Sequence, residues 1–190
     1  MSHINKEDFI SLVKENIKRE GIDNLIKYLE GTDFFEAPAS SMYHSDYDGG
    51  LIDHSYNVFK LLSESDKLDH NIYSMESIAI VSLFHDVCKA NFYVKGERNV
   101  KSEEGKWVKV PYYKIDEAFP MGHGEKSVYI VGKYLDLTDD EALAINWHMG
   151  SFDNRCKGGD RSLSKVFQRS LLALELHIAD MRAAYILENF

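Results

Sequence analysis

The sequence of 190 residues has little of what marks secreted or membrane-spanning proteins. It contains two cysteines, Cys88 and Cys156, and no CxxC pair, so neither a disulfide scaffold nor a thiolate-rich zinc site is expected. Its N-terminus is polar and charged, unlike a secretory signal peptide. No apolar run reaches the roughly 18 residues that a bilayer span needs. These absences predict a cytoplasmic protein with no membrane partner.

Positive charge is also scarce, with 22 Lys and Arg against 31 Asp and Glu and a formal net charge of −9. Proteins that bind long nucleic acid present a basic face, so such a partner is not expected. The segment from Arg155 to Arg169 is a local exception and contains Arg161 and Lys165. It has two interpretations, a solvated loop and helix face or a contact for the phosphate tail of a small substrate.

The chain lacks GxGxxG and Walker A motifs and shows no alternation of strands and helices, which argues against a nucleotide-binding α/β fold. Helical spacing of apolar residues predicts helices over about residues 5–20, 23–31, 51–63, 75–89, 124–135, 138–148 and 163–188. Three helix starts have cap candidates, Asn5, Asp23 and the TDDE capping box that begins at Thr138. Residues 92–115 are rich in β-branched and aromatic residues around KSEEGK, which predicts a β-hairpin. We therefore expect one mainly α domain, residues 1–190, with a small β-hairpin insertion.

Histidine and aspartate recur where these predicted helices begin or end, or on their apolar faces. A single histidine in such a place is more often a structural hydrogen-bonding residue than a metal ligand. Imidazole nitrogen and carboxylate oxygen are, however, the ligands of zinc, iron, manganese and nickel, so the set together favours a shared metal site. Its members are His54, His85, Asp86, His123, His148 and Asp180.

The order His54, His85-Asp86, Asp180 resembles the H…HD…D motif of the HD-domain metal-dependent phosphohydrolases. GGLIDHS resembles the GL-x-x-H-S/T opening of that superfamily, and HDVCK resembles its HD-hydrophobic-x-K form. GHGEKS and NWHMG supply His123 and His148, where members with two metals add two histidines. Residues 34–55 are most similar to HD domains of the 3′→5′ exoribonuclease and relaxase-associated type. The resemblance covers roughly residues 34–185.

The resemblance implies a helical bundle with the metal site among its helices. The four residues of the H…HD…D motif would hold one metal, and Asp86 would bridge to a second metal held by the two added histidines. The cofactors would be one or two divalent transition metals, Mn, Fe, Ni, Co or Zn. The implied activity is hydrolysis of a phosphate ester in a small substrate, a nucleotide or deoxynucleotide, by metal-activated water.

Departures from the family leave other functions open. The chain leaves no room for the OB domain of the exoribonucleases, has no GYP triplet, and carries Cys88 where many members have glycine. The alternatives are a 3′→5′ exonuclease acting on short single-stranded ends and a metal- or nucleotide-binding regulatory module without turnover. An oxygenase branch also uses HD-type ligands. The sequence does not address oligomeric state.

Lys89 shares a helix face with His85 and Asp86 because it lies four and three residues after them. It is either a phosphate contact, as the family pattern favours, or a last-turn lysine placed by the helix dipole. Asp86 and Lys89 are the predicted catalytic residues, and Lys89 is also predicted to bind substrate.

Other side chains have two interpretations each. His44, in the long loop before residue 51, is a substrate ligand at the mouth of the site or a surface residue. Asp53 orients an imidazole or is an acidic residue in a first helical turn. His177 lies behind the metal site or is simply packed, and His3 and His70 are predicted on the surface. The hairpin aromatics, such as Trp107, stack on a base or pack the hairpin onto the bundle.

Overall fold

A computed structural model describes residues 3–41, 43, 45–68 and 72–188. Its helices are α1 (Lys6–Asn16), α2 (Ile22–Glu30), α3 (Gly50–Leu68), α4 (Met75–Phe84), α5 (His123–Val131), α6 (Asp139–Trp147), α7 (Asn154–Lys157), α8 (Ser162–Arg169) and α9 (Leu171–Arg182). Two 3₁₀ turns, η1 (Val87–Lys89) and η2 (Gly150–Phe152), and one π turn, η3 (Ala183–Leu187), adjoin them. The strands are β1 (Tyr93–Lys101) and β2 (Trp107–Ile115). The predicted mainly α fold with one hairpin is confirmed.

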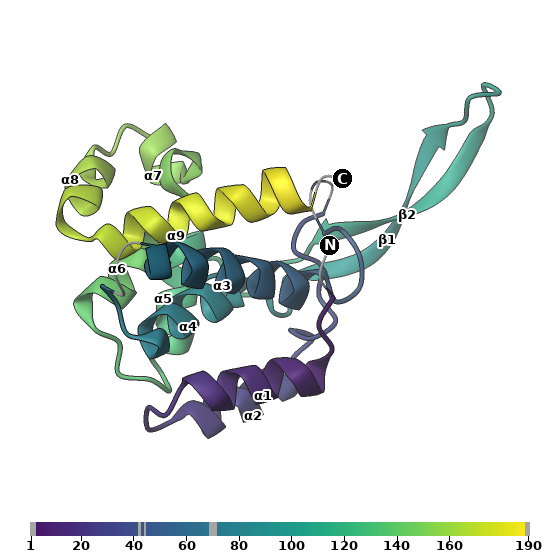
Figure 1. Cartoon of the computed structure of the whole chain (residues 1–190). Coiled ribbons are helices and arrows are strands. Elements are labelled where there is room, and N and C mark those ends of the chain that lie inside the picture. The colour runs from purple at the N-terminus through teal and green to yellow at the C-terminus, as the bar shows by residue number, and fades with distance from the viewer. Residues whose placement is uncertain (1–2, 42, 44, 69–71, 189–190) are drawn as a thin grey trace.

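The bundle is centred on α4, which packs against α3, α6 and α1, while α9 crosses over α3 and α6 (Figure 1). Every residue of α4 from Ile78 to Phe84 is buried, which explains why its sequence is apolar on all sides. Each fully buried Leu, Ile or Phe in such a position contributes about 1.5–3 kcal/mol to folding. The helix is therefore a rigid support for the residues that follow Phe84.

Helix α1 ends at Asn16, so the expectation that it continues to about residue 20 is wrong. The backbone N–H groups of Lys18 and Arg19 donate to Oε1 of Glu76 at 2.7 and 2.9 Å, which turns the chain away from the helix. The expected cap at Asp23 is also wrong, because α2 begins directly after Gly21. Gly21 has a φ of 95° and a Cβ there would meet the carbonyl oxygen of Tyr134, so only glycine fits this turn.

The last predicted helix is not continuous. Ser170 has an extended backbone and its side chain accepts from the N–H of Ala173, so it ends α8 and caps α9. A short helix, α7, lies in the segment expected to be a loop, capped by Asp153. The capping box predicted at Thr138 is present, with Glu141 as its partner. Helix α3 continues to Leu68, beyond the expected end near residue 63.

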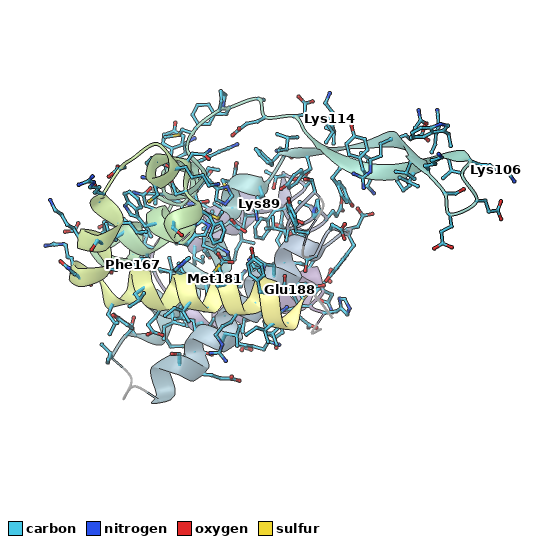
Figure 2. The ribbon with its side chains drawn as sticks, turned by 90° about the horizontal axis from the view of Figure 1, so that it is seen from above. Lys89, Lys106, Lys114, Phe167, Met181 and Glu188 are labelled. Atoms are coloured by element: carbon cyan, nitrogen blue, oxygen red, sulfur yellow. The ribbon has the colours of Figure 1, made fainter. Side chains whose placement is uncertain are left out.

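The hairpin pairs β1 with β2 in antiparallel register from Tyr93 opposite Ile115 to Lys101 opposite Trp107. It extends away from the bundle, and its tip at Lys106 lies far from Lys89 (Figure 2). Trp107 is 71% exposed, so it neither packs on the bundle nor lies near the centre of the molecule. In the described part of the chain, no helix has the length and apolar content needed to cross a membrane.

Candidate metal centre

The six predicted ligands lie together in the middle of the bundle, although they come from five separate segments. His54 is on α3, His85 and Asp86 follow α4, and the remaining three are His123 at the start of α5, His148 at the end of α6 and Asp180 on α9. Four of them are at most 2% exposed, namely His54, His85, Asp86 and His148. Polar groups buried to this extent need partners, which makes the cluster a candidate site.

His85 and His148 occupy equivalent positions, each as the C-cap of its helix. The Nδ1 atom of His85 donates to the carbonyl oxygen of Ser82 at 2.8 Å, and Nδ1 of His148 donates to that of Ile145 at 2.7 Å. These bonds leave Nε2 of both rings unprotonated, as the acceptor that a metal requires. Two helix C-termini also direct their negative dipole ends at the centre, which favours a bound cation.

His54 is held in a similar way by a residue that the sequence did not indicate. Its Nδ1 lies 3.1 Å from the carboxylate of Glu188, and its Nε2 faces the centre, 3.1 Å from Asp180. Glu188 follows Asp180 by eight residues, about two helical turns, and this spacing was the available sign that both face the same side. Ser45 and Asn57 donate to Glu188 and fix its carboxylate.

Asp86 lies between two groups of imidazoles. Its Oδ1 is 2.7 Å from Nε2 of His123 and 3.4 Å from Nε2 of His148. Its Oδ2 is 3.5 Å from Nε2 of His85 and 3.8 Å from Nε2 of His54. One carboxylate therefore presents a different oxygen to each pair of histidines, as a bridging ligand does.

The donor set fits divalent metal. The buried Nε2 atom of His148 has no hydrogen-bond partner among the described residues, which is costly unless a cation binds it. Three groups have all their donor atoms within 4.8 Å of one another: His54, His85 and Asp86; Asp86, His123 and His148; and His85, His148 and Asp180. Nitrogen and oxygen donors without thiolate suit Mn, Fe, Ni, Co or Zn.

Charges in the cluster are arranged to keep its carboxylates ionised. Burial by itself raises the pKa of Asp86, but Lys89, His85 and His123 outweigh it and hold that pKa well below the usual value. Nζ of Lys89 lies 2.6 Å from Oδ2 of Asp86. Burial likewise lowers the pKa of His54, but its bonds to Asp180 and Glu188 raise that pKa to about 10. The centre therefore stabilises positive charge.

Cys88 lies beside the centre, with Sγ 3.3 Å from Nδ1 of His123. Its N–H group donates to the hydroxyl of Ser127 on α5, which ties η1 to that helix. A small side chain is needed at this point because the imidazole of His123 passes between Cys88 and Asp86.

The other predicted residues have different surroundings. The carboxylate of Asp53 accepts from His3 at 2.6 Å, from the N–H of Ile4 at 2.8 Å and from the hydroxyl of Tyr47 at 2.8 Å, so it ties the N-terminal segment and the loop before α3 to that helix. His3 is exposed, as expected. Nδ1 of His177 donates to the carbonyl oxygen of His148 at 2.6 Å, so His177 supports the backbone of a predicted ligand. His44 and His70 lie outside the described residues.

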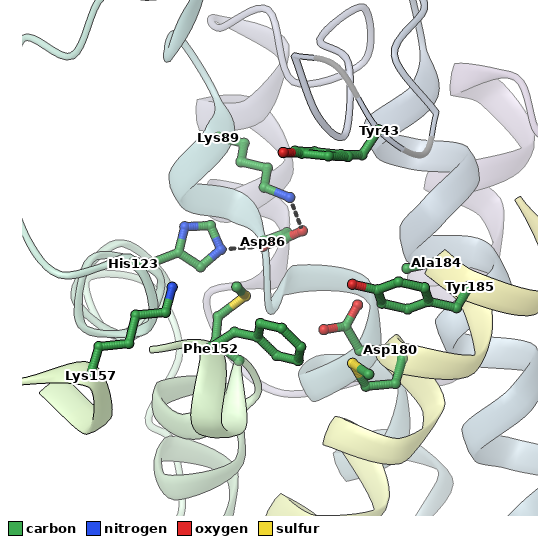
Figure 3. Close-up of a pocket in the computed structure, with 11 residues that line it drawn as sticks. Tyr43, Asp86, Lys89, His123, Phe152, Lys157, Asp180, Ala184 and Tyr185 are labelled. Carbon is green, nitrogen blue, oxygen red and sulfur yellow. Dashed lines mark hydrogen bonds and ion pairs between the residues drawn. The ribbon is translucent and has the colours of Figure 1, made fainter. Parts of the chain in front are cut away.

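A pocket of about 520 Å³ opens beside the centre (Figure 3). Asp86, His123 and Asp180 line it, and Lys89 and Lys157 add two positive charges. Arg161 and Lys165, predicted to bind substrate, are exposed side chains that are not among the described residues lining this pocket. From that basic segment, Lys157 lines the pocket, whereas the sequence had singled out Arg161 and Lys165.

Comparisons with known proteins agree with this geometry. The family model described as HD domain matches residues 51–185, which include all six predicted ligands. A stretch of 66 residues is 35% identical to the dihydroneopterin 2′,3′-cyclic phosphate phosphodiesterase of Methanocaldococcus jannaschii, covering 33% of this chain and 26% of that protein. The chain thus spans about a quarter of this relative, and no solved structure matches. Because the family model covers more than half of the chain, the protein belongs to the HD domain family.

Proposed function

We propose that this protein hydrolyses a phosphate ester bond in a nucleotide or a nucleotide-like small molecule. The observation that carries the proposal is the position of Asp86, which offers one oxygen to each pair of histidines and lines the pocket. His54, His85, Asp86 and Asp180 would hold one divalent ion, and Asp86, His123 and His148 a second. Bound metal supplies Lewis-acid activation of water and of phosphate oxygens.

The protein's own residues prepare the pocket for phosphate. Lys89 is nearly buried, lines the pocket, and has a pKa raised by Asp86 despite its burial, so it stays charged. A positioned ammonium group can donate to a phosphate oxygen and stabilise the negative charge that develops during hydrolysis. We therefore assign Lys89 to phosphate binding and Asp86 to organising the centre.

The size of the pocket supports a small substrate. A volume of about 520 Å³ is in the range of pockets that enclose one small ligand. The net charge of −9 disfavours long nucleic acid. The relative from Methanocaldococcus jannaschii acts, by its name, on a cyclic phosphodiester attached to a pterin. This likeness supports phosphodiester cleavage here, whereas the exoribonuclease-type relationship stays a prediction.

A substrate screen tests the proposal. Purified protein loaded in turn with Mn, Fe, Ni, Co or Zn would be given nucleoside mono- and triphosphates, nucleoside 2′,3′-cyclic phosphates and short RNA. We expect turnover of a small phosphate ester, lost in Asp86→Asn and retained in Asp140→Asn, which changes an exposed aspartate. Mononucleotides released from RNA would instead indicate the exonuclease. Metal and nucleotide binding without any turnover would indicate a regulatory module and overturn the proposal.

A further inference from the structure

Exposed aromatic rings are concentrated around the pocket. Among the described residues, six Phe, Tyr and Trp side chains are at least 40% exposed, and three of them line the pocket: Tyr43, Phe152 and Tyr185. Of the others, Phe119 and Tyr129 contact each other, and Trp107 lies on the hairpin. Half of the exposed rings therefore border one hollow beside the metal centre.

The three rings come from distant parts of the chain and are placed by the elements that carry the ligands. Phe152 ends the 3₁₀ turn four residues after His148, and Tyr185 lies in the π turn five residues after Asp180. Tyr43 lies in the loop before α3. π turns occur often at functional sites, because the extra residue redirects the side chains that follow.

None of the three rings has an aromatic partner among the described side chains, although they are 80%, 44% and 58% exposed in chain order. Leaving apolar surface in water is unfavourable, and packing inside the protein does not account for these positions. Met149 and Met181 also line the pocket and add polarisable sulfur, which packs well against aromatic groups.

The pocket wall has a cationic side and an aromatic side. In Figure 3, His123 and Lys157 lie at one side of the pocket and Tyr185 at the other, Phe152 lies at the bottom, and Tyr43 lies at the top, near Lys89 in this view. Lys157 forms no ion pair within the described part of the chain, so its charge is available to a ligand. A ligand that fills this pocket therefore has an anionic end and an apolar, ring-binding end.

We infer that the aromatic side is a binding subsite for a planar nitrogen heterocycle, with Phe152 and Tyr185 as stacking surfaces and Tyr43 as a cover. The phosphate of the same molecule would lie toward Lys89 and Lys157. This inference deepens the proposed function by naming the part of the substrate that is recognised. Ring binding itself needs no metal, so it can be measured separately from hydrolysis.

The test compares ligands with and without the heterocycle. AMP and ribose 5-phosphate carry the same phosphorylated sugar, and calorimetry on metal-free full-length protein gives the affinity for each. We expect AMP to bind more tightly, and Phe152→Ala or Tyr185→Ala to weaken AMP by about 5- to 150-fold, the effect of losing one base–aromatic stack. Binding of ribose 5-phosphate should not change. Tyr129→Ala, which removes a ring of the same 44% exposure as Phe152, should change neither ligand.

The outcomes separate this inference from the proposed function. Three results would overturn the subsite. They are equal affinity of the wild-type protein for the two ligands, no measurable binding of AMP, and an equal decrease of affinity for both ligands in the ring variants. Selective loss of AMP by the ring variants in a protein that hydrolyses nothing would support the subsite and reject the hydrolase. Hydrolysis by the wild-type protein, together with ring variants that bind AMP as tightly as wild type, would support the hydrolase and reject the subsite.

Discussion

The carboxylate of Glu188 lies 3.1 Å from Nδ1 of His54, although 134 residues separate the two. Ser45 donates to Glu188 at 2.9 Å and Asn57 at 3.1 Å, so the loop before α3, α3 itself and the turn after α9 meet at this carboxylate. A carboxylate behind a metal-binding imidazole fixes its tautomer and orientation. The end of the described chain therefore takes part in building the candidate centre.

We predict that Glu188→Ala lowers metal affinity by about 10- to 100-fold, the usual effect of removing such a partner. Titration against a competing chelator would measure it. Glu175→Ala is the matched control, because Glu175 is also a glutamate on the last helices and bonds to Ser65 away from the centre. Metal affinity in Glu188→Ala equal to that of the control would contradict the role assigned to Glu188.

The arrangement around Asp86 predicts two metal ions per chain. His123→Ala removes a donor from one side of Asp86 only, so we expect this variant to retain a single ion. His85→Ala removes a donor from two of the three clusters and is expected to lose most of the metal. Elemental analysis of protein loaded with metal and desalted would give both values. His3→Ala, an exposed histidine, serves as control, and an unchanged metal content in His123→Ala would reject the second site.

Lys89 is expected to matter for turnover rather than for metal binding. Replacing it by methionine keeps the apolar stem and removes the charge that lines the pocket. Loss of a donor that stabilises developing charge costs about 10²–10³ in kcat, and we predict a decrease of this size with metal content preserved. Lys114→Met, an exposed lysine of the hairpin, controls for the loss of one positive charge. A wild-type rate in Lys89→Met would place Lys89 outside the reaction.

Stability at low pH is predicted to depend on Glu141. Nη1 and Nη2 of Arg19 lie 2.5 and 2.9 Å from its two oxygens, and the N–H of Thr138 also donates to it. Burial raises the pKa of Glu141, but these donors outweigh it and bring the pKa below the usual 4.5. The folded-state pKa of Glu141 therefore lies below its unfolded value. The stabilisation by the ionised carboxylate is complete above pH 4.5 and is lost as pH falls through the folded-state pKa.

Glu141→Gln should therefore destabilise the protein by about 1.5–3 kcal/mol at pH 7, the contribution of hydrogen bonds to a charged group. The difference in the free energy of unfolding between variant and wild type should shrink below pH 4.5, because the wild-type carboxylate then becomes protonated and also loses its charge. Denaturant unfolding at several pH values would measure this. Glu15→Gln changes an exposed glutamate and should have little effect at any pH. If the difference in the free energy of unfolding stays constant with pH, the ionised pair of Arg19 and Glu141 is excluded as its cause.

Local interactions explain why much of the secondary structure was predictable. Thr138 and Glu141 form their capping box within four residues, and the hairpin follows from β-branched and aromatic residues on either side of a short turn. The errors occur where a distant partner intervenes. Helix α1 ends early because Glu76, 57 residues beyond Arg19, captures backbone N–H groups. Ser170 divides the last helix because its hydroxyl competes with the backbone, which helical spacing does not reveal.

By itself the sequence determined which residues are candidate ligands, their order along the chain and most of the helices that carry them, because these depend on residue type and on short-range spacing. Only the tertiary structure decided that Glu188 orients His54, that Lys157 rather than Arg161 or Lys165 reaches the pocket, and that Tyr43, Phe152 and Tyr185 meet around it. These relationships join residues far apart in the chain. They arise from the way the buried faces of α3, α4, α6 and α9 pack together, and no local pattern encodes that packing.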